Sequence, residues 1–184
     1  GGQLDCRCPD GLTGRHITLN FPSVGATENV MLAAISAKGE TVITNAAREP
    51  EIADLADYLN KCGVTVSGAG QSVIRIISDG KFCSAEHRII PDRIVASTFM
   101  AAVACAGGSI CVAGVEKEHL APVIPVFEAA GCNFDFSGDE MTAEFYGRPR
   151  RVRRLRTMPY PGFPTDSQAL FMAVAAKANG TSVV

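Results

Sequence analysis

Hydrophobic and polar positions along the chain form blocks that alternate between helical and strand periodicity. Ala-rich stretches with apolar residues three or four apart predict helices, whereas short β-branched runs predict strands. The first block predicts, in order, an Ala-rich helix after Pro22–Thr27 that ends near Gly39, a strand at Thr41–Thr44, a helix from Glu49 to Gly63, and strands near Val64–Ser67 and Val73–Ile77.

The same order then repeats. Pro22 and Pro91 are 69 positions apart, and Gly63 and Gly131 are 68 apart, so two independent markers give nearly the same period. The second block predicts a helix from Pro91-Asp92-Arg93 to Gly107-Gly108, a strand at Ser109–Ala113, a helix from Glu118 to Gly131, and strands near Asn133–Phe136 and Met141–Phe145.

A third, partial block opens at Pro164-Thr165-Asp166, with Thr165 or Asp166 predicted as the N-cap. Its helix is expected to reach Asn179-Gly180, and a strand is expected at Thr181–Val184. Residues 3–20 are expected to be the closing strands of a preceding block, with a turn at Pro9–Gly11. Because a partial block leaves an apolar helix face without a partner, we expect the chain to be a fragment of a longer protein.

Alternating helices and strands favour an α/β fold with Ala-rich helices packed inside sheets. The residues Arg148–Arg156 stand apart, with six Arg in nine positions. Arg occupies both faces of a period-two pattern, so an exposed edge strand is predicted, because charge there discourages aggregation. A patch that binds phosphate or nucleic acid is the alternative.

The overall charge argues against proteins that bind nucleic acid or membrane surfaces. The 184 residues carry a net charge of −2, with a pI near 5.9, which gives no reason to expect nucleic acid or a membrane surface as a partner. The apolar runs are shorter than the roughly 20 residues needed to cross a bilayer. No signal peptide and no initiator Met are visible, and a cytoplasmic location is predicted.

The seven Cys are odd in number and scattered, which is typical of reduced thiols, and we expect them to be buried. Cys6 and Cys8 would share one face of a strand, so a pair of metal ligands is one interpretation. No second Cys or His pair has ligand spacing, so no metal site is predicted.

The helix starts are the candidate binding sites. A helix N-terminus offers free N–H groups and positive dipole potential, which suit an anionic or hydroxyl-bearing ligand. At Phe163–Gln168 a lone carboxylate, Asp166, stands at this junction, and Ser23 stands at the first copy. An ordinary capping role is the alternative for both residues.

Four segments together resemble the UDP-N-acetylglucosamine enolpyruvyl transferase family. The resemblance covers nearly the whole chain, in the family's order and spacing. The segments are Pro22–Asn29, Asn45–Ile52, Ile90–Ile94 and Pro161–Ala169.

The resemblance implies the enolpyruvyl transferase fold, an inside-out α/β barrel built from βαβαββ-type repeats. It assigns residues 1–90 to the end of the catalytic domain and residues 91–184 to part of the second domain. It also implies a transferase that moves the enolpyruvyl group of phosphoenolpyruvate to the 3′-hydroxyl of UDP-N-acetylglucosamine by addition and elimination, the first committed step of bacterial peptidoglycan synthesis. No metal or organic cofactor takes part in the family's reaction.

The family's site residues carry over by position. Asp166 matches the carboxylate at the 3′-hydroxyl, the candidate general base. By the same resemblance, Thr165 is expected to shape this loop and to contact the sugar. The segment Ser23-Val24-Gly25 matches the helix start that faces the UDP diphosphate. Asp92 and Arg93 are interpreted as support for the site, with a purely structural ion pair as the alternative.

The chain departs from the family in several places. The family's phosphoenolpyruvate-binding Lys and Arg and its reactive loop Cys have no counterpart among these residues. Tyr160 stands where the family usually has His, and Ser97 where Gly is usual. We therefore expect the chain alone to lack transferase activity. The alternatives are a related enolpyruvylshikimate phosphate synthase, a non-catalytic paralogue, and a nucleic-acid-binding module built on the Arg run.

Overall fold

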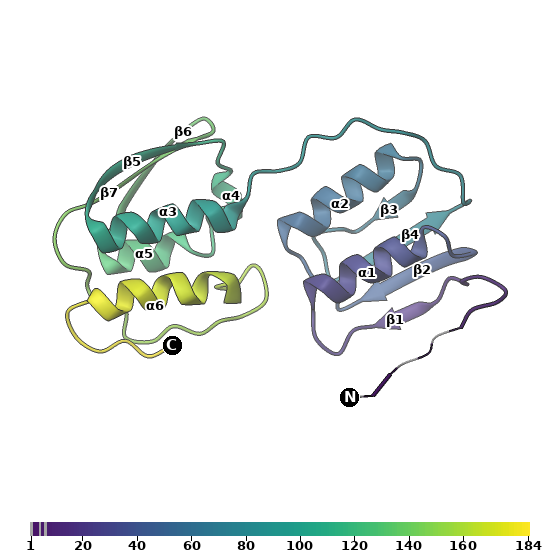
Figure 1. The fold of residues 1–184 in the computed structure, drawn as a ribbon, viewed down its shortest axis with the longest axis horizontal. Coiled ribbons are helices and arrows are strands. Elements are labelled where there is room, and N and C mark those ends of the chain that lie inside the picture. Colours follow the sequence, from purple (N-terminus) through teal and green to yellow (C-terminus); the bar gives the residue numbers. More distant parts are fainter. Residues whose placement is uncertain (1, 4, 6) are drawn as a thin grey trace. The chain divides into compact units, whose positions relative to one another are not determined.

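The computed structural model describes residues 2, 3, 5 and 7–184, which form two compact units (Figure 1). Unit 1 is Gly1–Ile89 and unit 2 is Ile90–Val184. Each unit has a hydrophobic core of its own and is described separately below.

Unit 1 is a four-stranded sheet with two helices over one of its faces (Figure 1). The strand order is β1-β2-β4-β3, with β1 parallel to β2 and the other pairs antiparallel. The elements are β1 (His16–Thr18), α1 (Val24–Ala34), β2 (Gly39–Thr44), α2 (Pro50–Lys61), β3 (Thr65–Ser67) and β4 (Val73–Ser78).

Unit 2 packs its helices against a three-stranded antiparallel sheet of order β5-β7-β6. The elements are α3 (Arg93–Ala106), β5 (Gly108–Ala113), α4 (Lys117–Leu120), α5 (Ile124–Ala130), β6 (Asn133–Ser137), β7 (Glu140–Phe145), the 3₁₀ turn η1 (Thr165–Ser167) and α6 (Gln168–Lys177).

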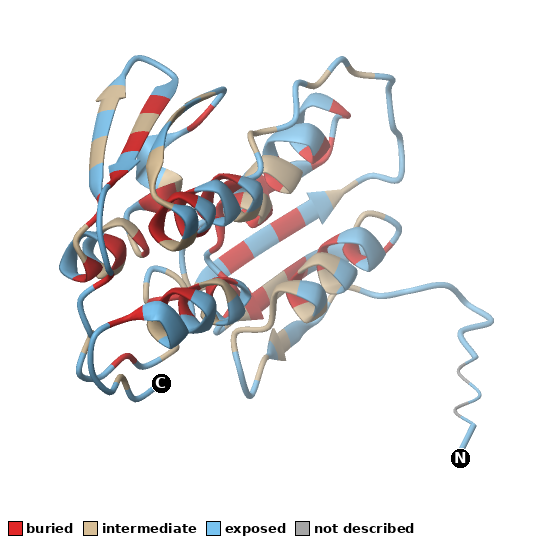
Figure 2. Cartoon of the chain, turned by 60° about the vertical axis from the view of Figure 1, so that its left-hand side comes forward, coloured by how far each residue is buried: buried red, intermediate tan, exposed pale blue. Residues whose placement is uncertain are grey.

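The two units share one plan, which confirms the predicted repeat and the α/β fold class. In unit 1, β4 lies between β2 and β3 and is antiparallel to both. In unit 2, β7 has the same relation to β5 and β6. Alternate residues of β4 are buried, as Figure 2 shows, because one face of the sheet meets the helices and the other meets solvent.

The helix predicted between Glu118 and Gly131 is wrong as one element. The structure has two short helices, α4 and α5, separated by three turn residues. Pro122 and Pro125 explain the break, since each lacks the N–H that would continue the helical ladder. In the turn, the Val123 N–H donates to the Leu120 carbonyl over 2.9 Å, a tighter bond than an α-helix makes.

The strands predicted at Arg148–Arg156 and Thr181–Val184 are also wrong. The structure forms no continuous ladder between them: Arg154 makes an isolated parallel bridge with Val183, Arg150 makes another with Asn179, and the Val152 N–H donates to Ser182 Oγ over 3.2 Å. Pro149 has no N–H to give a ladder, and the C-terminal segment is not paired with a second strand on its other side within the described residues. The six Arg side chains are nevertheless exposed, as predicted.

Among the residues of 3–20 that the structure describes, one strand is present, β1, rather than the closing strands that were predicted. An isolated bridge joins Thr13 to Lys38, and the expected turn is present, since the Gly11 N–H donates to the Cys8 carbonyl over 3.2 Å. Cys6, which with Cys8 was the possible pair of metal ligands, lies outside the described residues.

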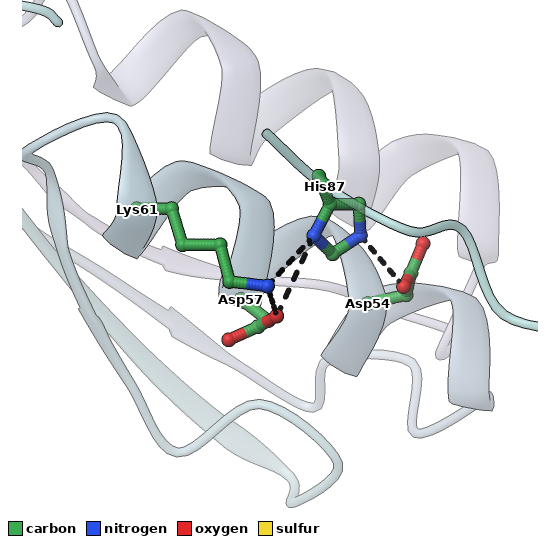
Figure 3. Close-up of polar contacts among 4 residues, drawn as sticks. All are labelled: Asp54, Asp57, Lys61 and His87. Carbon is green, nitrogen blue, oxygen red and sulfur yellow. Dashed lines mark hydrogen bonds and ion pairs between the residues drawn. The ribbon is translucent and has the colours of Figure 1, made fainter. Parts of the chain in front are cut away.

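A coil follows β4 and runs to α3, and it is fastened to α2 at two points. The Cys83 N–H donates to the Cys62 carbonyl over 3.0 Å. Farther along, His87 lies across α2, with only 9% of its side chain exposed (Figure 3). Its Nε2 is 2.9 Å from Asp54 Oδ1, and its ring centroid is 5.6 Å from that of Tyr58.

Lys61 completes this cluster on α2 (Figure 3). Its ammonium lies 3.2 Å from His87 Nδ1 and 2.6 Å from Asp57 Oδ2. An ammonium group is only a hydrogen-bond donor, so Nδ1 accepts a hydrogen bond from Lys61 and Nε2 donates one to Asp54. The hydrogen bond from Lys61 lowers the pKa of the Asp57 carboxyl below its usual value. His87 is therefore held from both ring nitrogens.

We expect His87→Ala to loosen the coil between Ser78 and Arg93. The substitution removes the buried ring and both polar contacts, so local opening becomes easier. Trypsin should then cleave after the exposed Arg88 at least about fivefold faster, because proteolysis follows the population of the opened state. His16→Ala, on the exposed strand β1, is the matched control. Equal cleavage rates in the two variants would show that His87 does not hold the coil.

Candidate functional site

The start of α1 is built around Ser23, whose backbone is extended and whose Oγ accepts the Ala26 N–H over 3.3 Å. Ser23 therefore has the capping role that was the alternative to ligand binding for this residue. Thr27 is fully buried and joins this start to the next loop: its Oγ1 donates to the Ser23 carbonyl over 2.8 Å and accepts the Ala47 N–H over 3.0 Å.

The first helical residues, Val24 and Gly25, follow this cap. Their N–H groups are among those that an α-helix leaves without an internal acceptor, and they carry the positive end of the dipole. A Cβ at Gly25 would meet nothing within 4 Å, so packing inside the described part of the chain does not demand a glycine. The space above this residue is open to a ligand.

The start of α3 has a stronger cap. Asp92 Oδ1 accepts the N–H groups of Ile94 over 2.7 Å and Val95 over 3.1 Å. Asp92 is thus occupied as a cap. Ser97, the residue that replaces the family's usual Gly, is 2% exposed and donates to the Arg93 carbonyl over 2.8 Å. The helix therefore accommodates this departure without leaving the hydroxyl unpaired.

The helix start before α6 differs from those of α1 and α3. Neither Thr165 nor Asp166 is an N-cap, so that prediction is wrong. Both belong to the 3₁₀ turn η1, in which the Ser167 N–H donates to the Pro164 carbonyl over 3.2 Å, and no side chain caps η1 or α6. The backbone closes the turn itself, which leaves the Asp166 side chain available for other contacts.

Asp166 meets Arg93 in unit 2. Arg93 Nη2 lies 3.8 Å from Asp166 Oδ2; the arginine side chain is 6% exposed and the carboxylate side chain 50% exposed. The guanidinium carbon of Arg93 also lies 6.0 Å from the ring centroid of Tyr160. The structure thus brings together two predicted residues and adds Tyr160, which the sequence marked only as a departure.

Phe163 fixes the loop that carries Asp166. It is buried, and its carbonyl accepts the Met158 N–H over 2.9 Å. Its ring packs edge-on against that of Phe171 in α6, with 6.2 Å between the centroids. The loop is therefore held by the hydrophobic core directly before the exposed Thr165 and Asp166.

The thiols do not add a site. Cys62 and Cys132 are buried as predicted, but Cys8, Cys83 and Cys111 are exposed, so the expectation of buried thiols holds only in part. Burial raises the pKa of the Cys132 thiol to about 11, which keeps it protonated at neutral pH. Across residues 2, 3, 5 and 7–184, no three His, Cys, Asp or Glu side chains are grouped to hold a metal ion.

None of the helices that the structure describes is long and apolar enough to cross a membrane.

Comparison with protein-family models matches residues 3–184 to EPSP synthase (3-phosphoshikimate 1-carboxyvinyltransferase). Two curated relatives carry the name UDP-N-acetylglucosamine 1-carboxyvinyltransferase. The protein numbered 1 from Symbiobacterium thermophilum is 50% identical over all of this chain and 41% of its own length. The protein from Finegoldia magna is 48% identical over 99% of this chain and 43% of its own length. The chain thus spans about two fifths of these relatives.

Solved structures show the same fold. The enolpyruvyl transferase NikO from Streptomyces tendae matches with a TM-score of 0.78 at 24% identity, over 95% of this chain and 44% of that one. An EPSP synthase from Acinetobacter baumannii matches with a TM-score of 0.61 at 24% identity, over 94% of this chain and 40% of that one. These likenesses confirm the predicted enolpyruvyl transferase fold.

Proposed function

Because this chain belongs to the EPSP synthase (3-phosphoshikimate 1-carboxyvinyltransferase) family, we propose that it works within a UDP-N-acetylglucosamine 1-carboxyvinyltransferase. The observation that carries the proposal is the 50% identity to a relative of that name over the whole chain. In this proposal, residues 1–90 are the end of the catalytic domain and residues 91–184 are part of the second domain.

The proposed reaction has two steps. The 3′-hydroxyl of UDP-N-acetylglucosamine adds to the C2 carbon of phosphoenolpyruvate, the hydroxyl proton goes to a base, and the methylene carbon takes a proton from an acid. Phosphate then leaves the tetrahedral intermediate as the new methyl group loses a proton, and the enolpyruvyl ether remains. We place this reaction in the bacterial cytoplasm, at the first committed step of peptidoglycan synthesis, on which cell shape and division depend.

Asp166 is the proposed base. Its side chain is half exposed, and it follows a loop that buried Phe163 holds in place, so the carboxylate is both reachable and fixed. Thr165, the exposed neighbour in η1, is proposed to contact the sugar. Asp92 supports the arrangement by capping α3 at the residue before Arg93.

Ser23, Val24 and Gly25 are the proposed diphosphate site. Two N–H groups at the positive end of α1 lack helical acceptors, and the open space at Gly25 lets an anion approach the backbone. Eleven residues of α1 contribute aligned peptide dipoles behind this site. Both proposed substrate groups thus meet helix starts, one in each unit.

A chimera tests the proposal. In it, this chain replaces the matching segment of the Symbiobacterium thermophilum relative, which supplies the remaining residues. We expect the chimera to release phosphate from phosphoenolpyruvate when UDP-N-acetylglucosamine is added, and not when 3-phosphoshikimate is added instead. The chain alone should release none above background. A folded chimera that is inactive beside an active parent would contradict the proposed function, and release with 3-phosphoshikimate would favour the EPSP synthase reaction.

A further inference from the structure

Arg93 is a buried cation at the first position of α3. A buried guanidinium is costly unless charge and hydrogen bonds compensate it. One compensating group is Asp166, whose Oδ2 lies 3.8 Å from Nη2. This distance is longer than a direct hydrogen bond, so Asp166 does not by itself fix where the guanidinium lies.

Tyr160 supplies a second support for the same guanidinium. The Arg93 guanidinium carbon stands 6.0 Å from the Tyr160 ring centroid, at the outer range of a cation–π contact. The Tyr160 hydroxyl donates to the Glu118 carbonyl over 3.3 Å, which ties the ring to α4. On its other side, Tyr160 belongs to a loop that the Gly162 N–H closes by donating to the Pro159 carbonyl over 2.8 Å. The ring is therefore held at both ends.

This arrangement distinguishes the two oxygens of Asp166. Oδ2 lies 3.8 Å from Arg93 Nη2, and the carboxylate side chain is 50% exposed. The attraction between the guanidinium and the nearer oxygen favours orientations in which the other oxygen points away from the cation. A general base needs such a direction, because proton transfer requires hydrogen-bond reach to the donor.

We propose that Tyr160 is a positioning residue for Asp166: it seats the Arg93 guanidinium against Oδ2 and so leaves Oδ1 to accept the proton of the substrate hydroxyl. The inference rests on the proposed function for the identity of that hydroxyl. It assigns no proton transfer to Tyr160, which acts only through Arg93.

The test compares two substitutions in the chimera described above. Tyr160→Leu removes the aromatic face. It should lower kcat about tenfold, which is within the range expected for the loss of a cation–π contact. KM for UDP-N-acetylglucosamine should stay within about threefold of the unsubstituted value. Tyr160→Phe keeps the ring and should stay within about threefold of the unsubstituted chimera. Tyr146→Leu, at a residue that is 75% exposed in the same unit, is the matched control.

A second measurement needs no substrate. Carbodiimide labelling of carboxylates in the 184-residue chain, read by mass spectrometry, should modify Asp166 about threefold faster in Tyr160→Leu, because a freed Arg93 no longer shields Oδ2. Labelling of the exposed Asp139 should not change. If Tyr160→Leu does not fold, Arg93→Lys tests the same contact, since lysine keeps the charge but lacks the planar face.

The outcomes separate the two proposals. Equal kcat in Tyr160→Leu and Tyr146→Leu would overturn the positioning role, as would a loss in Tyr160→Phe as large as in Tyr160→Leu. Unchanged Asp166 labelling in both Tyr160→Leu and Arg93→Lys would overturn it as well. A chimera without activity in any form would instead overturn the proposed function, while labelling still decides whether Tyr160 and Arg93 hold Asp166.

Discussion

Asp166→Asn is expected to lower kcat of the chimera at least about 100-fold, the usual effect of removing a general base. Asparagine has nearly the same size as aspartate and keeps an oxygen that accepts a hydrogen bond, but its amide does not take up a proton at neutral pH. KM for UDP-N-acetylglucosamine should therefore stay within about threefold, since the lost interaction belongs to the transition state.

The substitution should leave the fold intact. Asp166 caps no helix, and the backbone hydrogen bond from Ser167 to Pro164 closes η1 without its side chain. Asp139→Asn, in the exposed turn before β7, is the matched control and should keep full activity. The measurement is phosphate release under saturating substrates, together with the melting temperature of each variant. Activity of Asp166→Asn within threefold of the unsubstituted chimera would mean that another group takes the proton.

Local chemistry explains why some of these features could be predicted from the sequence. Ser23 and Asp92 each precede an apolar helical pattern, and both cap their helices, because a cap needs only a side-chain oxygen two or three residues before a free N–H. For Ser23 the cap was the alternative to a binding role, whereas for Asp92 only a supporting role or an ion pair was predicted. Proline and glycine markers likewise revealed the repeat, since they stop helices and turn chains wherever they occur.

Other features depend on contacts that sequence spacing does not contain. Asp166 and Arg93 are 73 positions apart, and their pairing arises because α3 and η1 pack together in unit 2. The strand predicted at Thr181–Val184 failed for a related reason: a β-branched run becomes a strand only where a neighbour offers a continuous ladder. The prediction for Glu118–Gly131 was wrong because an apolar stripe does not keep a helix continuous where Pro122 and Pro125 remove backbone N–H donors.

The Asp166 loop combines one feature that could be predicted from the sequence with one that could not. The sequence marked Phe163–Gln168 as a helix start, and the structure places its first polar residues in a 3₁₀ turn instead of a cap. This difference bears on function, because a carboxylate that caps a helix spends its oxygens on backbone N–H groups. Asp92 is fixed in that way through Oδ1, which accepts two backbone N–H groups, whereas Asp166 caps no N–H group.

Phe127→Ala is expected to destabilise unit 2 by about 3–5 kcal/mol, the range for deleting a buried aromatic ring. Phe127 is fully buried, and its ring meets Phe171 edge-on at 6.0 Å and Phe134 at 6.5 Å between centroids. Phe171 in turn contacts Phe163 at 6.2 Å. The lost ring therefore leaves a cavity and removes two edge-to-face contacts from the series of packed rings that reaches the Asp166 loop.

Tyrosine fluorescence can isolate this effect, because the sequence has three Tyr and no Trp. Unit 1 contains only Tyr58, so urea unfolding in a Tyr58→Phe background is followed through Tyr146 and Tyr160, which both belong to unit 2. The difference in the free energy of unfolding comes from the shift of the midpoint at constant slope.

Phe99→Ala is the control for this experiment, since Phe99 lies in α3 of the same unit with 45% of its surface exposed. Its loss should cost less than about 1 kcal/mol, because little apolar area returns to water and alanine favours the helix. If Phe127→Ala and Phe99→Ala shift the urea midpoint equally, the edge-on packing of these rings is not the main support of unit 2. If Phe127→Ala is the more destabilising variant, it should also raise the rate of carbodiimide labelling of Asp166. The reason is that the core that fixes Phe163 also fixes the loop beside it.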